Sequence, residues 1–483
     1  MQLHCPETSP TSLGNTEPGN LTPEFLSSLR ETYQMNGPDR ACHNAVTASP
    51  TNTLALNRGL LRGDDSHFSH RVYTKGILDQ KHSGRCWIFA GLNVMRPQVI
   101  RDHNMESFEF SATYLQFWDK LEKANLYFES VIELRDAQFM DRDWEIVHKA
   151  AMEDGGWWNY LAALVAKYGV VPLSAMPETH ASSNTATLNE ILGRLLRSRA
   201  ANLIAQHNNG ATPDDLRTSK NNILTEVYRI LVIHLGEPPV SFDWRFTTRT
   251  SENSTSEPAS EPATDLHSAA NKLLTPTEHH TPRSFYQKYV ARPLSEYVCL
   301  YSDPSNQPNR HYRFDRARNM IGEPCMNFVN ITSEDMKRIA ISSITANESL
   351  WFAVNMNFDQ SLELGLMKHR LFDYESLFGI DLTLTKADRT RFHSGASGHA
   401  MSLIGVDLDP DAKPLKWLVE NSWGDDKGNK GLWTLHDDWF DEHVYTIISH
   451  RSHVPEEILK HFDQEPITLP AWYPGARACQ LNP

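Results

Sequence analysis

The chain has 483 residues, of which 40% are hydrophobic, enough to bury the core of two or three domains. It carries 46 Lys and Arg residues against 60 Asp and Glu residues, a net charge of −14, without any Lys/Arg-rich stretch. This balance argues against phosphate-driven binding of nucleic acid as a function. No apolar run approaches the ~18 residues that a membrane span needs.

The first 39 residues (1–39) are predicted to be a flexible N-terminal segment. Residues 1–20 are polar and rich in Ser, Thr and Pro, without the apolar region of a secretory signal. Arg30 is the first Lys or Arg, so an Arg-rich mitochondrial presequence is not expected. The six cysteines are scattered, with neither a disulfide framework nor zinc spacing. These features predict a cytoplasmic protein.

The segment Gln80–Trp87 places a cysteine where a thiol nucleophile is expected. Cys86 opens a run whose apolar residues repeat at helical spacing, which predicts a helix from Cys86 to Met95. The first turn of a helix carries a partial positive charge that lowers the pKa of a thiol. The backbone N–H of Cys86 and the side-chain amide of Gln80 are predicted to form an oxyanion hole.

The pair Gly155 and Gly156 has two open interpretations. It is either a plain turn or one edge of a substrate cleft, where bare backbone pairs with an extended peptide.

The stretch 181–345 is predicted to be a mostly helical insertion. Helical periodicity is clear in Leu188–Leu196 and in Ile223–Leu231. The acidic, Ser-rich run Ser251–Pro262 cannot bury a core, and the region of about 247–280 around it is predicted to be a flexible surface loop.

Two further segments, His399–Val406 and Lys416–Asn421, are predicted to be strands joined by a turn-rich connection. An antiparallel hairpin sets the start of its first strand beside the end of its second, so His399 and Asn421 are expected to be neighbours. The Asn421 side chain then accepts from one ring nitrogen of His399 and leaves the other for the thiol. Trp423 is predicted to shield this hydrogen bond at the substrate cleft.

Taken singly, these residues say little, since a lone cysteine is most often a small buried hydrophobe. Cys86, His399, Asn421 and Gln80 in this order are the side chains of a papain-type hydrolase. They predict amide hydrolysis through an acyl-enzyme, in which a thiolate attacks and His399 protonates the leaving amine. This chemistry needs no metal and no organic cofactor.

The chain resembles the bleomycin hydrolase and aminopeptidase C family of cytosolic papain-like cysteine peptidases. The resemblance runs from about residue 40 to Ala478. The segments that carry it include HNAVT (43–47), GRCWIFA (84–90), FWDK (117–120), KYGVVP (167–172), VENSWG (419–424), HVPEE (453–457) and LPAW (469–472).

This resemblance implies an α+β fold, with a papain-like core in two halves. Residues 40–180 would form the helical half with the nucleophile, and residues 346–465 the β-rich half with His399 and Asn421. Cys86 and His399 are about 310 positions apart, against roughly 130–150 in simple papain-like enzymes. The insertion 181–345 therefore separates the halves, and in the family it builds oligomer contacts. A homohexamer with active sites facing an internal cavity is implied.

Residues 466–483 are expected to form a C-terminal arm that reaches the active site. In the family, the arm presents its terminal carboxylate to the amino group of the substrate, an ammonium that it binds by a charge-assisted hydrogen bond. Here the chain continues past Ala478 to Pro483, and Tyr473 stands where the family has Asp. Our hypothesis is that the enzyme trims its own tail; alternatively, the extra residues push the carboxylate deeper, fold aside or have little effect.

Residues and resemblance together predict a cysteine aminopeptidase that acts on peptides and small amides. The alternatives are a cysteine endopeptidase or a nucleic-acid-binding homologue, if the extended arm no longer gates the cleft, and an inactive structural homologue.

Overall fold

The computed structural model describes residues 18–62, 64–249, 273–290, 292–476 and 478–479. They belong to two compact units. One unit combines the N-terminal residues up to 62 with Phe372–Thr383, and the other combines Asp64–Leu371 with the chain from Leu384 onward. Among the helices described, none joins the length and the apolar character that crossing a membrane requires.

The described part of the smaller unit is helical. Its helices are α1 (Pro23–Thr32), α2 (Gly37–Val46), α3 (Thr51–Ala55) and α13 (Tyr374–Phe378). Thr22 and Asn36 cap α1 and α2, because their side chains accept a hydrogen bond from the first turn of each helix. Helix α1 lies within the segment predicted to be flexible, and none of its residues is buried. Residues 1–17 of that segment lie outside the described residues.

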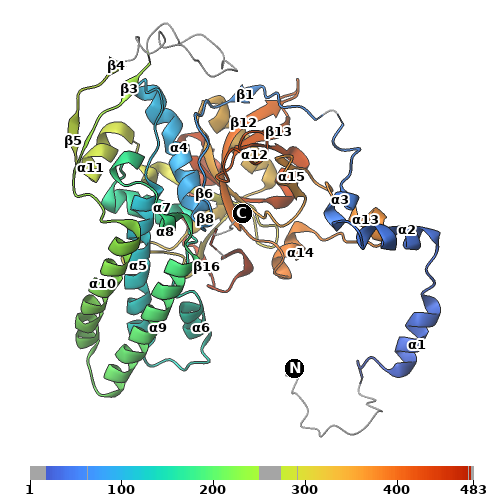
Figure 1. Cartoon of the computed structure of the whole chain (residues 1–483), viewed down its shortest axis with the longest axis horizontal. Helices are drawn as coiled ribbons and strands as arrows, with labels where there is room; N and C mark the ends of the chain where they lie inside the picture. The colour runs from blue at the N-terminus through green and yellow to red at the C-terminus, as the bar shows by residue number, and fades with distance from the viewer. Residues whose placement is uncertain (1–17, 63, 250–272, 291, 477, 480–483) are drawn as a thin grey trace. The chain divides into compact units, whose positions relative to one another are not determined.

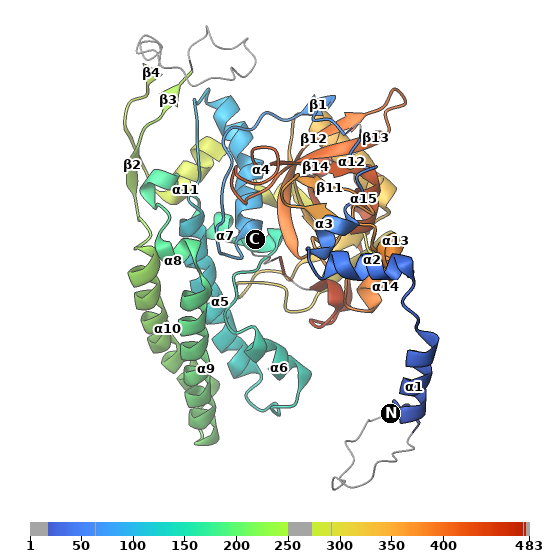
Figure 2. The same cartoon turned by 45° about the vertical axis from the view of Figure 1, so that its right-hand side comes forward.

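In the larger unit, the central helix is α4 (Cys86–Asp102), which starts at the residue predicted and runs past Met95. Almost every residue of α4 is buried, as expected for a helix with apolar side chains on all its faces. Figures 1 and 2 both show it between the helices on the left of the view and the large sheet. The remaining helices are α5 (Ala112–Glu133), α6 (Arg142–Lys149), α7 (Trp158–Tyr168), α8 (His180–Ser183), α9 (Ala186–Asn208), α10 (Pro213–Leu235), α11 (Pro282–Phe285), α12 (Ser333–Thr345), α14 (Lys386–Arg391), α15 (Asp437–His443) and α16 (Glu456–Leu459).

Helices α5, α9 and α10 pack against one another (Figure 1). Leu188, Leu192 and Leu196 recur at every fourth position of α9 and are buried, as are Val227 and Leu231 of α10. The helical periodicity seen in the sequence is therefore the periodicity of buried contacts, and both helices predicted from it are confirmed.

The described strands of the larger unit form one 12-stranded sheet and two two-stranded sheets, β2 with β5 and β3 with β4. Within the large sheet the order is β10-β11-β14-β13-β12-β9-β15-β6-β8-β7-β16, and β1 pairs with β12. The strands are β1 (His70–Arg71), β2 (Phe242–Trp244), β3 (Thr247–Thr248), β4 (Leu273–Leu274), β5 (Glu278–His280), β6 (Tyr297–Tyr301), β7 (Arg310–Phe314), β8 (Asn327–Asn330), β9 (Leu350–Val354), β10 (Gln360–Ser361), β11 (Leu366–Met367), β12 (His399–Leu408), β13 (Pro414–Glu420), β14 (Leu432–His436), β15 (Val444–His450) and β16 (Ile467–Leu469).

Both strands predicted for the second half of the site are present. The segment beginning at His399 is β12, and the segment before Asn421 is β13. The two pair antiparallel, with Ser402 opposite Glu420. His399 therefore starts one strand beside the point where its neighbour ends, as the hairpin argument requires.

Of the stretch 181–345, predicted to be a mostly helical insertion, Ala186–Asn208 and Pro213–Leu235 are helices, and residues 242–330 also contribute the strands β2 to β8. Strand β6 pairs with β15, which lies in the predicted β-rich half. Aromatic and β-branched residues favour strands, and the segment Tyr297–Tyr301 is rich in both. Of the acidic loop predicted at about 247–280, residues 250–272 lie outside the described residues.

Candidate active site

Cys86 is the first residue of α4 and is fully buried. The preceding residue, Arg85, is held by Glu178 through two hydrogen bonds, Nη1 to Oε1 at 3.1 Å and Nη2 to Oε2 at 2.8 Å. A guanidinium that donates to both oxygens of one carboxylate is fixed in orientation as well as in position. The thiol is thus set at the positive end of a helix, where the helix dipole favours the thiolate.

Three contacts hold α4 against the sheet. Ser402 Oγ on β12 donates to Ala90 O at 3.0 Å, and Trp351 Nε1 on β9 donates to Trp87 O at 3.1 Å. Arg96 and Glu420 form a buried ion pair with an Nη2–Oε1 distance of 2.5 Å. Because Glu420 directly precedes Asn421, this pair connects the nucleophile helix to the strand that ends at the asparagine.

His399 and Asn421 are hydrogen-bonded, with 2.9 Å between Nε2 and Oδ1, and both side chains are buried. The other ring nitrogen of His399, Nδ1, has no hydrogen-bond partner among the described residues. The Trp423 ring lies 4.7 Å from the imidazole and is 5% exposed. Asn421 therefore orients the imidazole, Trp423 covers the bond, and Nδ1 is the nitrogen left for proton transfer.

Burial lowers the pKa of His399 to about 4, because a charged ring is poorly solvated there, and the hydrogen bond to Asn421 opposes this only in part. Asn421 carries no charge, so it orients the ring without stabilising its charge strongly. A charged imidazole at this position would therefore need a negative charge close by to offset the desolvation.

Gln80 is buried and connects the loop before Cys86 to the segment after Asn421. Its backbone N–H donates to Ser422 O at 2.8 Å, and Ser422 Oγ donates to its Oε1 at 2.7 Å. Its Nε2 donates to Ser83 O at 2.6 Å. The Gln80 amide is thereby held at both ends next to the catalytic hairpin, and an amide NH₂ has a hydrogen for each of two acceptors.

Gly156 provides a backbone edge to the C-terminal arm. Its N–H donates to Cys479 O at 3.1 Å, and its carbonyl accepts from Cys479 N at 3.3 Å. A Cβ at this position would lie 2.4 Å from the Trp87 ring. Of the two interpretations of the glycine pair, this pairing with an extended segment favours the cleft edge. The Gly155 carbonyl accepts from Lys123 Nζ at 2.6 Å.

The described part of the arm reaches this region at Ala478 and Cys479. Ala478 lines a cavity of about 180 Å³ together with Gly155 and Tyr160. Cys479 is fully buried, and its Sγ lies 3.6 Å from Ser397 O. Burial raises the pKa of the Cys479 thiol. Pro483 lies outside the described residues.

Asp154 is a central residue of the site that the sequence analysis missed. Its carboxylate accepts hydrogen bonds from Lys120 Nζ (2.7 Å), Gly84 N (2.9 Å), Thr185 Oγ1 (2.5 Å) and Asn189 Nδ2 (3.0 Å), and its carbonyl accepts from Trp87 Nε1 (2.8 Å). Burial alone would raise the pKa of Asp154, but the Lys120 charge and these hydrogen bonds outweigh it and hold the pKa well below its usual range. The sequence signal that could have identified Asp154 is its charge within an apolar segment, because a buried charge requires partners.

Comparisons with known proteins agree with this geometry. The Peptidase C1-like family model matches residues 20–264 and 265–476. Aminopeptidase C of Streptococcus thermophilus is 34% identical over 457 residues, covering 94% of this chain and 98% of its own length. Bleomycin hydrolase of Rattus norvegicus is 33% identical over 472 residues, covering 95% of this chain and 99% of its own.

A solved structure of PepW from Lactobacillus rhamnosis HN001 has a TM-score of 0.87 and 32% identity, covering 95% of this chain and 100% of its own. The match extends over both the helical and the sheet-rich parts, so the α+β papain-like fold predicted from the sequence is confirmed. The chain belongs to the Peptidase C1-like family.

Proposed function

We propose that this protein is a cysteine aminopeptidase, which removes N-terminal residues from peptides and hydrolyses small amides. The observation that carries the proposal is the pairing of Cys479 with Gly156, beside the hydrogen-bonded His399 and Asn421. An extended peptide would pair with the same glycine backbone. The arm thus occupies part of a cysteine peptidase cleft, which leaves room for only the end of a substrate.

In the proposed reaction, the Cys86 thiolate attacks the substrate carbonyl and the imidazole of His399 protonates the leaving amine. The backbone N–H of Cys86 and the amide of Gln80 donate to the oxyanion, which carries charge only in the tetrahedral intermediate. Water, deprotonated by His399, then releases the acid. Asn421 keeps the imidazole in one orientation through both steps.

We also propose that the protein works in the cytoplasm as a homohexamer. Support for association comes from large apolar side chains on the surface, such as Phe139 and Met140, which are 78% and 77% exposed. Adjacent exposed apolar groups are typical of protein contacts. The family resemblance supports a hexamer as the form that such contacts build.

The test is hydrolysis of two matched peptides, one with a free and one with an acetylated N-terminus. We expect the wild type to cleave the free peptide preferentially, and Cys86→Ala to lose about 10⁵-fold or more in kcat because the nucleophile is gone. Cys42→Ala, at a half-buried cysteine of the smaller unit, is the matched control and retains activity.

Equal cleavage of the acetylated peptide would replace this proposal by a cysteine endopeptidase. Activity of Cys86→Ala equal to that of wild type would rule out Cys86 as the nucleophile. Intact-mass analysis of the active wild type decides whether the tail is trimmed, because a full-length C-terminus excludes trimming.

A further inference from the structure

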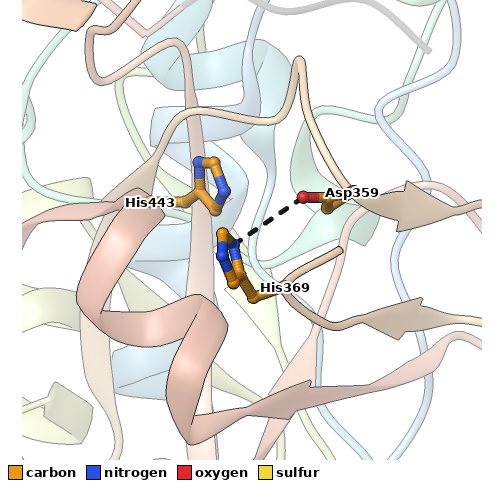
Figure 3. Close-up of side chains that lie close together, drawn as sticks. All are labelled: Asp359, His369 and His443. Atoms are coloured by element: carbon orange, nitrogen blue, oxygen red, sulfur yellow. Dashed lines mark ion pairs between the residues drawn. The ribbon is translucent and has the colours of Figure 1, made fainter. Parts of the chain in front are cut away.

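Away from the catalytic residues, three side chains with metal-binding atoms converge in the larger unit. They are Asp359 just before β10, His369 just after β11, and His443 at the end of α15. One donor atom of each lies within 4.8 Å of the donor atoms of the other two. Figure 3 shows the carboxylate and the two rings close together, with Asp359 directed toward His369.

The imidazole of His443 is the most unusual member of this group. It is 2% exposed, and neither ring nitrogen has a hydrogen-bond partner among the described residues. The ring packs against Trp439 at 4.7 Å and Phe358 at 6.0 Å between centroids. A buried polar group without a partner costs free energy, so the fold retains here a ligand atom that its own described side chains do not use.

His369 also has a ring nitrogen that makes no hydrogen bond within the described part of the chain. This nitrogen, Nδ1, lies 3.9 Å from Asp359 Oδ2. The Asp359 carboxylate is held in place by the backbone N–H of Arg370, at 3.0 Å from Oδ2. A carboxylate and a half-exposed imidazole thus face a buried imidazole, which leaves one side of the group open to solvent.

We propose that Asp359, His369 and His443 bind a divalent transition-metal ion of the zinc type, with water as the fourth ligand. Imidazole nitrogen and carboxylate oxygen are ordinary ligands of zinc. Tetrahedral coordination places ligand atoms about 3.3 Å apart, so atoms now within 4.8 Å of one another meet the requirement after small side-chain rotations. Asp359 and His369 flank the short β10–β11 hairpin, and their side chains are 19% and 38% exposed.

Positive charges near the group oppose the binding of any dication, so only an ion that gains from direct bonds to imidazole nitrogen is expected to bind. Arg389 and Lys386 add positive potential at His443. Arg389 is paired with Glu442 at 2.5 Å, and Lys386 Nζ donates to Val444 O at 2.7 Å. A hard cation held mainly by negative charge would bind weakly here, whereas zinc and cobalt gain from direct bonds to imidazole.

The ion would stabilise the sheet and take no part in hydrolysis, so it does not conflict with a metal-independent reaction. Asn355 N donates to His443 O at 2.9 Å, and the next residue, Val444, pairs with Val354 of β9. Val354 in turn pairs with His399. The ion would therefore tie the β10–β11 hairpin to the strands that carry the catalytic imidazole.

The test uses the full chain without a histidine tag, in a Cys86→Ser background so that the catalytic thiol does not bind the probe. Co²⁺ is titrated and followed by its visible d–d bands, and Zn²⁺ is used for thermal melts. His369→Ala and Asp359→Asn change the two ligands that are partly exposed and leave the buried His443 in place. His279→Ala is the matched control, because that exposed histidine pairs with Asp243 at 2.8 Å and belongs to no group of three such ligands in the described part of the chain.

We expect one equivalent of Co²⁺ to bind without the charge-transfer bands of a thiolate ligand. Each ligand variant should weaken binding by about 100-fold or more, given that even the partners of metal ligands contribute 10–100-fold. Zn²⁺ should raise the Tm of the background protein and of His279→Ala, but not that of His369→Ala. Absence of binding, a thiolate signature, or equal binding by both ligand variants and the control would overturn the proposal.

Discussion

At the scale of single residues, Asp154 fixes both sides of the cleft. Through Gly84 it holds the turn before Cys86, and its backbone leads directly into Gly155 and Gly156. Its charge is balanced by the buried ammonium group of Lys120 at 2.7 Å. The position of the nucleophile therefore depends on a carboxylate that takes no part in the chemistry.

Asp154→Asn is expected to lower the free energy of unfolding by about 3 kcal/mol at neutral pH, because it leaves the Lys120 charge buried without its partner. The folded-state pKa of Asp154 is depressed, so the stability from this group is present above the unfolded-state pKa of about 3.9 and is lost as the pH falls through the folded-state value. The difference between wild type and variant should thus be constant near neutrality and shrink below pH ~4.

Urea unfolding between acid and neutral pH checks this prediction. Asp214→Asn is the control, since that side chain is 94% exposed and its pairing with Arg217 contributes little. A stability difference for Asp154→Asn that grows on acidification would contradict the assigned sign.

At the scale of elements, the aromatic ring of Trp87 forms the contact between helix α4 and the backbone at Gly156. Trp87, the second residue of α4, packs directly under Gly156 and donates to Asp154 O. The same edge pairs with the arm at Cys479. Helix α4, the Gly156 backbone and the C-terminal arm can therefore pack this closely because residue 156 has no side chain.

Gly156→Ala is expected to lower kcat/KM and to cost about 1–3 kcal/mol of stability, as is usual for overpacking. A Cβ there would lie 2.4–2.7 Å from three atoms of the Trp87 ring, and either the ring or the edge must move. Peptidase kinetics and thermal melts measure the two effects. Gly37→Ala is the control, because its Cβ meets nothing within 4 Å. Wild-type kinetics in Gly156→Ala would show that this edge does not bind substrate.

At the scale of the whole molecule, the property to test is the proposed association into a homohexamer. Native mass spectrometry or light scattering should give about six times the 55.0 kDa mass of the chain. Phe139→Glu/Met140→Glu is expected to weaken the assembly, since it places charge on two side chains that are 78% and 77% exposed. A monomer in wild type would contradict the hexamer and leave the aminopeptidase proposal intact.

Local patterns in the chain were sufficient to place the main elements of the site. The helix beginning at Cys86 and the strands β12 and β13 follow from apolar periodicity and turn residues, which are properties of neighbouring positions. The proximity of His399 to Asn421 followed as well, because an antiparallel hairpin relates the ends of two strands that are close in sequence.

By itself the sequence thus determined the family, the α+β class and the residues available for thiol chemistry. Only the tertiary structure showed that Lys120 pairs with Asp154, that β6 joins β15, that Cys479 pairs with Gly156, and that Asp359, His369 and His443 converge. Each joins positions far apart in the chain, where periodicity carries no information. Long-range packing of the folded chain, and no local pattern, decides which buried charge or imidazole meets which partner.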